Sequence, residues 1–221
     1  MENATRFTDY RAYVQLALHK LWKRIAEGGS NQPERIESPA RGVPGIVQKW
    51  KDFWHTGASG VAKHLYVGSA ADAASATTLA QLNIKLVVNC TPDIPNFFEG
   101  EDGAPQYARV PIEDGPGVSF REYATTVRDA VHHIQRVRGA GGNVLVHCLM
   151  GASRSVCVAC LTLLNEKDSV DMADEKEAAD KVYDTVRTAR APARINVSFM
   201  HDLRTKRDWW WGEDTPPPLV T

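Results

Sequence analysis

Residues 143–156, NVLVHCLMGASRSV, join an apolar run to a cysteine, a glycine, an arginine and a serine within a few positions. The run Val144-Leu145-Val146 predicts a buried strand, and the residues after Ser153 predict the start of a helix. Backbone N–H groups converge where a strand, a short loop and a helix N-terminus meet, and the helix dipole adds partial positive charge. The stretch therefore predicts a loop that binds an anion.

The side chains of this loop suit a nucleophile that attacks phosphate. Cys148 lies at the base of the predicted anion site, where the pKa of a thiol is lowered and the reactive thiolate forms. Arg154 offers a planar fork that matches two oxygens of a phosphate group. Gly151 allows a tight backbone turn close to a ligand. Ser155 can donate a hydrogen bond to the sulfur and so make it a better leaving group from a thiophosphate, and His147 can fix the loop from behind.

Strands alternate with helices on both sides of this stretch. The expected strands span residues 64–68, 85–90, 107–113 and 143–147, and the expected helices span 70–82, 119–138, 153–166, 174–189 and 196–208. Such alternation is typical of α/β domains in which helices cover a largely parallel sheet. We therefore predict an α/β fold with a central, mostly parallel sheet of four to five strands flanked by helices.

The chain divides into three parts on its sequence pattern. Residues 1–60 predict an N-terminal helical extension and linker, with an amphipathic helix at 6–27, a Pro/Gly-rich connector and a short helix at 46–55. Residues 61–208 predict the compact domain, which begins with its first strand near His64. Residues 209–221 predict a tail that starts with three tryptophans. Whether Trp209–Trp211 dock on the core or stay exposed is left open, as is the role of the 6–27 helix.

Composition excludes several classes of protein. Hydrophobic residues make up 43% of the 221, which is ample for one core. The net charge of −1 gives no global basic field for nucleic acid, so no nucleic-acid partner is expected. No apolar run approaches a membrane span, and the first residues lack the layout of a signal peptide. Four cysteines do not make a disulfide framework, so we expect a cytoplasmic protein, with the nucleus as the other possibility.

HCLMGASRS resembles the His-Cys-(five residues)-Arg-Ser/Thr signature of the cysteine-dependent protein tyrosine phosphatase superfamily. LYVGSAADA, LVVNCT, RVPIEDGPG and RINVSFMHDL are similar to segments of its dual-specificity subgroup, so the resemblance runs from about His64 to Arg204. It implies a dual-specificity phosphatase-like fold and a small, atypical member, since residues 1–60 are too short for a kinase-docking domain. It also implies a phosphate-binding loop made of Leu149, Met150, Gly151, Ala152, Ser153 and Arg154.

The resemblance implies a general acid on the segment PIEDGPG, where it selects Asp114. A carboxyl group on a Gly/Pro-rich loop suits a lid that closes over substrate. The neighbouring Glu113 would point the other way if the strand continued that far, and Asp93 and Asp102 are more distant alternatives. The implied reaction passes a phosphoryl group to Cys148 and then to water, and it requires no metal and no cofactor.

The other three cysteines have both a reactive and a packing interpretation. Cys157 and Cys160 form a C-x-x-C pair that suggests zinc or thiol redox chemistry, but no second ligand pair accompanies it, so small core residues are favoured. Cys90 ends a neighbouring strand, so it could lie near Cys148. As in some relatives, it could form a reversible disulfide with Cys148, although packing is the favoured interpretation.

The leading hypothesis is a phosphoprotein phosphatase that acts on phosphotyrosine and on phosphoserine/threonine, with a phosphoprotein as its partner. A phosphoinositide or RNA 5′-phosphate phosphatase on the same scaffold is the second hypothesis. Those relatives usually carry lysine or arginine inside the loop, whereas residues 149–153 carry no charge here, which favours phosphoprotein. A non-catalytic phosphate-binding scaffold module is the third, and it usually lacks the cysteine or the arginine. The oligomeric state is not predicted.

Overall fold

The computed structural model describes residues 57–115, 117–167 and 174–210, all of which belong to a compact unit that spans Phe53–Thr221. The expected helices at 6–27 and 46–55 lie outside the described residues. Within the described ranges, no helix is both long enough and apolar enough to cross a bilayer. The fold is therefore described for this unit alone.

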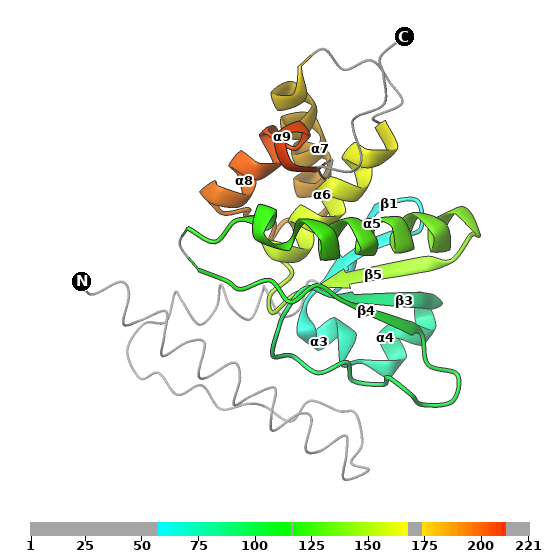
Figure 1. The fold of residues 1–221 in the computed structure, drawn as a ribbon. Helices are drawn as coiled ribbons and strands as arrows, with labels where there is room; N and C mark the ends of the chain where they lie inside the picture. Colours follow the sequence, from blue (N-terminus) through cyan, green and yellow to red (C-terminus); the bar gives the residue numbers. More distant parts are fainter. Residues whose placement is uncertain (1–56, 116, 168–173, 211–221) are drawn as a thin grey trace, which may run out of the picture. The chain divides into compact units, whose positions relative to one another are not determined.

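One mixed sheet forms the centre of the unit (Figure 1). Its strands are β1 (Ser59–Ala62), β2 (Leu65–Gly68), β3 (Ile84–Asn89), β4 (Gln106–Arg109) and β5 (Asn143–His147), in the spatial order β1-β2-β5-β3-β4. The pairs β2–β5, β5–β3 and β3–β4 are parallel, and β1 pairs antiparallel with β2 at the edge. The prediction of a mostly parallel sheet of four to five strands is confirmed.

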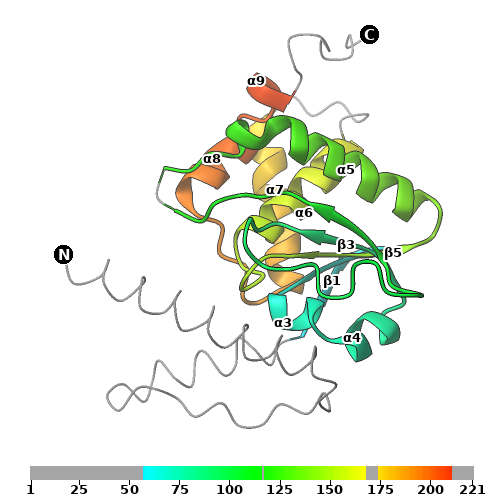
Figure 2. The ribbon, with the colours of Figure 1, turned by 60° about the horizontal axis from the view of Figure 1, so that its bottom comes forward.

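Helices cover both faces of this sheet, as Figures 1 and 2 show. One face carries α5 (Ala124–Gly139), α6 (Arg154–Lys167), α7 (Glu175–Ala189) and α8 (Val197–Arg204), and the other carries α3 (Ala70–Ala73) and α4 (Ala76–Gln81). Strand β5 shows how the sequence sets these layers. Val144 and Val146 pack into the larger core under α5 and α6, while Leu145 points into the smaller core with Leu79 of α4. The alternation is the two-residue period of a strand buried on both faces.

The structure corrects the ends of several expected elements. The strand predicted at 107–113 ends at Arg109, because Pro111 has no N–H to donate to a ladder, and the Ile112 N–H instead bonds the Val110 carbonyl at 2.8 Å. The helix predicted at 70–82 is two short helices, because the Ser75 hydroxyl caps the start of α4 by accepting from the Thr78 N–H at 3.1 Å.

The first strand was missed. The sequence places the start of the domain near His64, whereas β1 begins at Ser59. Its four residues, SGVA, contain little apolar surface, and the strand exists by pairing with β2 in the register Ser59↔Val67. Local propensity gave no signal for a strand that depends on its partner.

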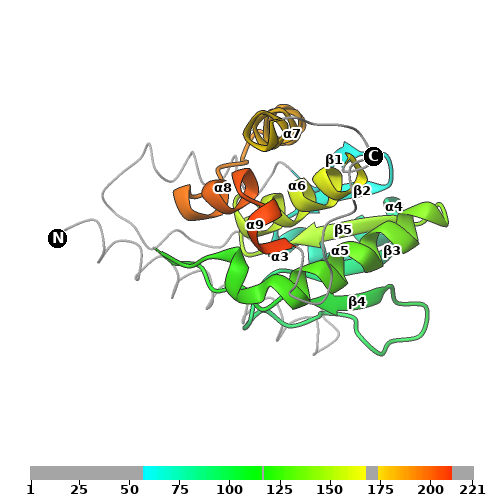
Figure 3. The same cartoon turned by 45° about the horizontal axis from the view of Figure 1, so that its top comes forward.

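Trp209 and Trp210, which follow the last long helix, belong to the core. The helix predicted at 196–208 is α8 followed, after a break at Thr205, by the short α9 (Arg207–Trp210), which lies beside α8 in Figure 3. Trp209 and Trp210 are both buried. The Trp209 indole donates to the Asp202 carbonyl at 2.9 Å, and Arg128 of α5 donates to the Trp210 carbonyl at 2.6 Å. Two residues of the segment expected as a tail, Trp209 and Trp210, are thus part of the core.

Candidate active site

The loop predicted to bind an anion connects β5 to α6. Strand β5 ends at His147 and α6 begins at Arg154, so residues 148–153 form the connection and the helix N-terminus faces it. We name residues 148–154 the Cys148 loop. It lies at the carboxyl ends of the parallel strands, which is where α/β sheets of this kind place their ligands. Cys148 and Arg154 are each only 3% exposed, so both reactive side chains lie inside the loop rather than on the surface.

The carbonyl groups of the Cys148 loop are bonded outward, one after another. The acceptors and their donors are Cys148 O from His147 Nδ1 (3.3 Å), Leu149 O from the Ala70 N–H (3.1 Å), Met150 O from Arg190 Nη2 (3.4 Å), Gly151 O from Arg190 Nε (2.5 Å) and Ala152 O from the Arg194 N–H (2.7 Å). Because the N–H of a trans peptide points opposite to its carbonyl, the N–H groups of residues 149–153 turn toward the loop interior. The loop is therefore a set of inward donors that suits a phosphate.

Gly151 is required by the shape of this loop. Its φ of +67° lies in the left-handed region that favours glycine. A Cβ at this position would also collide with the Gly68 carbonyl and with the guanidinium of Arg190. The Gly151 N–H lies 3.2 Å from the Cys148 sulfur and donates to it. Any side chain here would push the loop apart and move this N–H away from the sulfur.

The environment of Cys148 favours its thiolate form. Burial alone would raise the pKa of the thiol, but the Arg154 charge and hydrogen bonds from Ser155 and the Ala152 N–H outweigh burial, and the pKa is lowered. The Ser155 hydroxyl donates to the sulfur at 3.3 Å, as the sequence predicted. A buried thiolate held by several donors is prepared to attack an electrophile.

The guanidinium of Arg154 bonds the segment that follows β4. Nη1 donates to the Ile112 carbonyl at 3.1 Å, and Nη2 pairs with the Asp114 carboxylate at 3.1 Å. Nε is buried and has no hydrogen-bond partner within the described part of the chain. A buried guanidinium N–H without an acceptor is costly, so this donor is available for an incoming anion.

Asp114 is brought to the site by the segment between β4 and the helix that follows. We name residues 110–118 the Asp114 loop; Pro116 within it lies outside the described residues. The side chain is 47% exposed, and its carboxylate contacts Arg154 directly. Because β4 ends at Arg109, the alternation that argued against Glu113 does not apply, and the ion pair with Arg154 is what distinguishes Asp114 from Glu113.

The two more distant carboxylates lie on another segment. Asp93 and Asp102 are both exposed on the connection between β3 and β4. The structure therefore brings Asp114, and not this pair, into contact with the guanidinium of the Cys148 loop.

His147 supports the loop as a neutral ring. Burial, followed by the charges of Arg109 and Arg154, lowers the pKa of His147 to about 4, although its bond to the Cys148 carbonyl acts in the opposite direction. Its Nδ1 lies 3.3 Å from that carbonyl, so the proton of the neutral ring sits on Nδ1. This geometry agrees with the predicted role of His147 behind the loop.

Two positioning side chains were missed by the sequence analysis. Arg190, just after α7, donates to two carbonyls of the Cys148 loop, and Asp202 of α8 accepts from Ser119 Oγ (2.9 Å) and the Phe120 N–H (2.8 Å) at the end of the Asp114 loop. Both are buried. A charged residue that is buried by folding carries no local pattern in the sequence, so no signal identified them.

The remaining cysteines are buried free thiols. Cys157 and Cys160 pack into the main core, and burial raises the pKa of both, which agrees with the favoured packing interpretation. Cys90 lies beside the site, since its N–H donates to the His147 carbonyl at 2.8 Å. Burial, and then the charge of Cys148, raises its pKa. A reversible disulfide between Cys90 and Cys148 stays a prediction.

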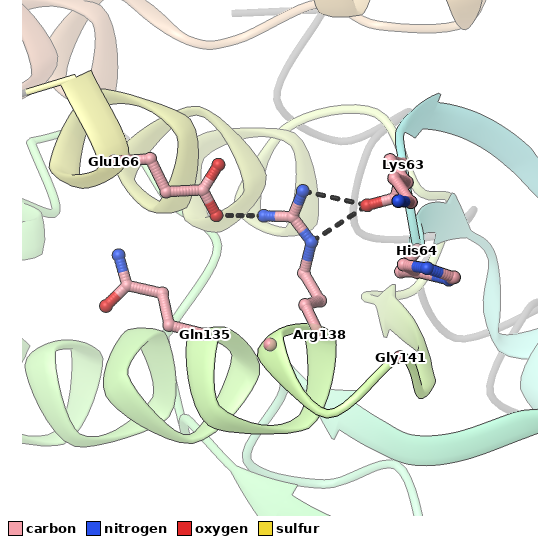
Figure 4. A pocket seen from close by; sticks show the side chains of 7 residues that line it. Lys63, His64, Gln135, Arg138, Gly141 and Glu166 are labelled. Carbon is pink, nitrogen blue, oxygen red and sulfur yellow. Dashed lines mark hydrogen bonds and ion pairs between the residues drawn. The ribbon is translucent and has the colours of Figure 1, made fainter.

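A second hollow, shown in Figure 4, lies at the other end of the strands. Lys63, His64, Arg138 and Glu166 are among its lining residues. Arg138 pairs with Glu166 and donates to the Lys63 carbonyl at 2.8 Å, so its charge is already compensated. The hollow adjoins Asn143, where β5 begins, whereas Cys148 follows the end of that strand. Arg138 thus joins α5 to α6 and to the β1–β2 turn. The hollow is separate from the Cys148 loop.

Comparisons with known proteins agree with this geometry. The family model described as "Dual specificity phosphatase, catalytic domain" matches residues 65–208. Human dual specificity protein phosphatase 9 is 34% identical over 140 residues, which cover 63% of this chain and 33% of that protein. Dual specificity protein phosphatase Mpk3 of Drosophila melanogaster is 39% identical over 139 residues, with 63% and 31% covered. The chain thus spans about a third of the length of these curated relatives.

Solved structures give the same result for the fold. The crystal structure of human DUSP28 superposes with a TM-score of 0.56 at 25% identity, covering 66% of this chain and 89% of that one. The Yvh1 phosphatase domain from Chaetomium thermophilum superposes with a TM-score of 0.56 at 25% identity, covering 70% and 94%. Since the family model matches more than half of the 221 residues, the assignment rests on the sequence as well as on the fold. The chain belongs to the dual specificity phosphatase catalytic-domain family.

Proposed function

We propose that this chain is a dual-specificity protein phosphatase, which hydrolyses phosphotyrosine and phosphoserine/threonine through a cysteinyl-phosphate intermediate. The observation that carries the proposal is the Cys148 loop, in which a thiol of lowered pKa lies beneath inward-facing N–H groups and beside an arginine whose Nε has no partner among the described residues. Such an arrangement binds a phosphate dianion and presents a nucleophile to its phosphorus in the same step.

The first step transfers the phosphoryl group to sulfur. The phosphate of the substrate enters the loop and competes with Asp114 for Arg154, which frees the carboxyl group to approach the leaving oxygen. The Cys148 thiolate donates an electron pair to phosphorus, and the bond between phosphorus and the ester oxygen breaks. Asp114, in its protonated form, passes its proton to that oxygen, so a neutral alcohol or phenol departs.

The second step returns the enzyme to its starting state. A water molecule gives its proton to the Asp114 carboxylate while its oxygen attacks phosphorus, and the sulfur–phosphorus bond breaks. The electron pair returns to Cys148, whose thiolate is stabilised by the Ser155 hydroxyl at 3.3 Å and the Gly151 N–H at 3.2 Å. Inorganic phosphate leaves, and Asp114 holds the proton that the next cycle requires.

Phosphoproteins are the substrate class that we propose. The uncharged interior of residues 149–153 offers no additional cation for a polyanionic phosphoinositide or an RNA 5′-phosphate. The names of the curated relatives, dual specificity protein phosphatases, support the same class. The third hypothesis, a non-catalytic module, is disfavoured by the presence of both Cys148 and Arg154 in the loop.

The proposal extends to the organisation of the chain and its location. We assign residues 61–208 to the catalytic domain, 1–60 to an N-terminal extension and 209–221 to a tail, and the match over 65–208 supports the first of these. We also propose a cytoplasmic or nuclear location. The four cysteines, all free thiols, support a reducing compartment.

The test compares substrates in the presence of a metal chelator. Matched phosphotyrosine and phosphothreonine peptides are assayed at equal concentration beside a phosphoinositide and a 5′-phosphorylated RNA. We expect turnover of both peptides, with phosphotyrosine faster because a phenol leaves more easily than an alkyl alcohol. Turnover of the phosphoinositide or the RNA alone would show that the substrate class is wrong, and activity on phosphotyrosine without any on phosphothreonine would remove the dual specificity.

A further inference from the structure

Arg190 is a buried cation on the outer side of the Cys148 loop. It follows the last residue of α7, and only 1% of it is exposed. Its guanidinium donates to Gly151 O at 2.5 Å, to Met150 O at 3.4 Å and to Gly57 O at 3.0 Å, and it reaches Ser59 Oγ at 3.3 Å. All these acceptors are uncharged oxygens. Burial lowers the pKa of Arg190, while the negative charges of Asp72 and Cys148 act to raise it.

The two loop carbonyls that Arg190 holds belong to peptides that face Cys148. The peptide with the Met150 carbonyl carries the Gly151 N–H, which donates to the Cys148 sulfur at 3.2 Å. The peptide with the Gly151 carbonyl carries the Ala152 N–H, which helps to lower the pKa of the Cys148 thiol. Arg190 therefore bonds the carbonyls of two peptide groups on the outer side of the loop. The N–H groups of the same two peptides act on the Cys148 sulfur on the inner side.

We propose that Arg190 is a positioning residue of the active site, which orients and polarises the peptides of residues 150–152 so that their N–H groups stabilise the Cys148 thiolate and the bound phosphate. A donor on a peptide carbonyl strengthens the N–H on the other side of that peptide, because hydrogen bonds in a chain polarise one another. A role of Arg190 in catalysis rests on the proposed phosphatase function. Its role in orienting the Cys148 loop rests only on the contacts of Arg190.

A purely structural role makes a different prediction. Arg190 also joins the loop to Gly57 and Ser59 at the start of β1, so its loss should lower stability in either case. A structural tie alone would leave the reactivity of Cys148 and the affinity for phosphate unchanged in the protein that remains folded. A positioning residue would change both.

The test uses Arg190→Met, Arg190→Lys and the control Arg187→Met. Arg187 lies three residues earlier on α7 and is exposed. The rate of alkylation of Cys148 by iodoacetamide is measured against pH, with mass spectrometry to assign the modified cysteine, and inorganic phosphate is titrated as a protecting ligand. We expect Arg190→Met to move the midpoint of alkylation to higher pH and to weaken protection by phosphate about tenfold. Arg187→Met should match the wild type in both measurements.

Arg190→Lys keeps the proposal testable if the methionine variant does not fold. An ammonium group restores the charge but cannot hold two carbonyls in the fixed geometry of a guanidinium. We expect it to move the midpoint of alkylation to higher pH by less than Arg190→Met does, and to weaken protection by phosphate. Wild-type protection in Arg190→Lys would overturn the proposal, and so would an unchanged alkylation profile in a folded Arg190→Met. Neither readout needs turnover, so an inactive wild type would refute the proposed function without deciding this inference.

Discussion

The Cys148 loop and the Asp114 loop meet at one ion pair, yet they are held in opposite ways. The carbonyls of residues 148–152 are all bonded to the surrounding structure, and Cys148 and Arg154 are 3% exposed. Asp114, by contrast, is 47% exposed in its side chain and contacts the body of the site through Arg154. A nucleophile and its phosphate need a fixed geometry, whereas a general acid must follow the leaving group and then exchange a proton with water.

The ends of the Asp114 loop are nevertheless fixed. The Ile112 carbonyl accepts from Arg154 at 3.1 Å, and the carboxylate of Asp202 accepts from Ser119 and Phe120 on the other side. Between these two anchors the Glu113 N–H donates to the Tyr123 hydroxyl at 3.4 Å, and Asp114 pairs with Arg154 at 3.1 Å. The contrast is therefore between a loop in which every carbonyl from residue 148 to residue 152 is bonded and a loop that is held at a few points. Each of the following changes tests one side of this contrast.

The largest effect is expected at the Cys148 loop. Cys148→Ser should lower turnover by about 10⁴-fold or more, because serine supplies no thiolate. The inward N–H groups remain, so inorganic phosphate or vanadate should still bind, as measured by calorimetry. Residual turnover close to that of the wild type, in the presence of a chelator, would mean that another group is the nucleophile.

The next largest effect is expected at the Asp114 loop. Asp114→Asn should lower kcat by about 10²–10⁴-fold on alkyl and phenyl phosphates, because the leaving oxygen loses its proton donor. The loss should shrink on substrates with an acidic leaving group, which needs no proton. Phosphate affinity should be equal or higher, since the variant no longer places a carboxylate on Arg154.

Asp102→Asn serves as the matched control for that prediction. Asp102 is an exposed carboxyl on the β3–β4 connection, and its variant should keep wild-type kinetics. If Asp93→Asn removed activity while Asp114→Asn kept it, the general acid would be on the β3–β4 connection, and its assignment to the Asp114 loop would be wrong.

An intermediate effect is expected at Asp202, which holds the far end of the Asp114 loop. Asp202→Asn weakens the acceptor for Ser119 and Phe120, so it should lower kcat by about tenfold and the free energy of unfolding by about 2 kcal/mol. Phosphate affinity should not change, because the Cys148 loop is held by other residues. Equal losses in kcat and in phosphate affinity would show that the two loops are not held independently.

The smallest effect concerns stability and pH. Folded His147 stays neutral down to a pKa of about 4, whereas the unfolded residue takes up a proton near its ordinary value of 6.5. Between these values the unfolded state binds more protons, so acidification favours unfolding, and the cost at pH 5 relative to pH 7.5 is about 2 kcal/mol. Between pH 7.5 and pH 5, the free energy of unfolding of His147→Gln should fall by about 2 kcal/mol less than that of the wild type. Urea unfolding at both pH values measures this difference. An identical loss in the two proteins would contradict a buried neutral histidine.

The same contrast explains what could be predicted from the sequence. The Cys148 loop is contiguous, so its nucleophile, its arginine and its glycine stand at fixed spacing beside a strand and a helix that are themselves readable. Its supports are not contiguous. Arg190 lies 39 residues from Gly151, and Asp202 lies 82 residues from Phe120. Both contacts therefore arise only when α7 and α8 pack against α6 in the folded domain.

Errors in the predicted elements have a similar cause. Tyr107 to Ile112 alternate like a strand, and only the missing N–H of Pro111 shows that the ladder stops at Arg109. Strand β1 has almost no apolar signal and exists through its partner β2. Trp209 and Trp210 could be either core or surface until the structure placed an indole on the carbonyl of Asp202.

The most direct measurement of the central claim is the detection of the covalent intermediate. Ser155→Ala removes the hydroxyl that donates to the Cys148 sulfur at 3.3 Å, so breakdown of the thiophosphate should become slower than its formation. The variant is mixed with an aryl phosphate, quenched after a few milliseconds to seconds, digested and mapped by mass spectrometry. The account predicts one phosphoryl group on the peptide that contains Cys148 and none on that peptide in the double variant Cys148→Ser/Ser155→Ala. Turnover with a phosphoryl group on a different residue, or with no phosphoenzyme at any time, would contradict it.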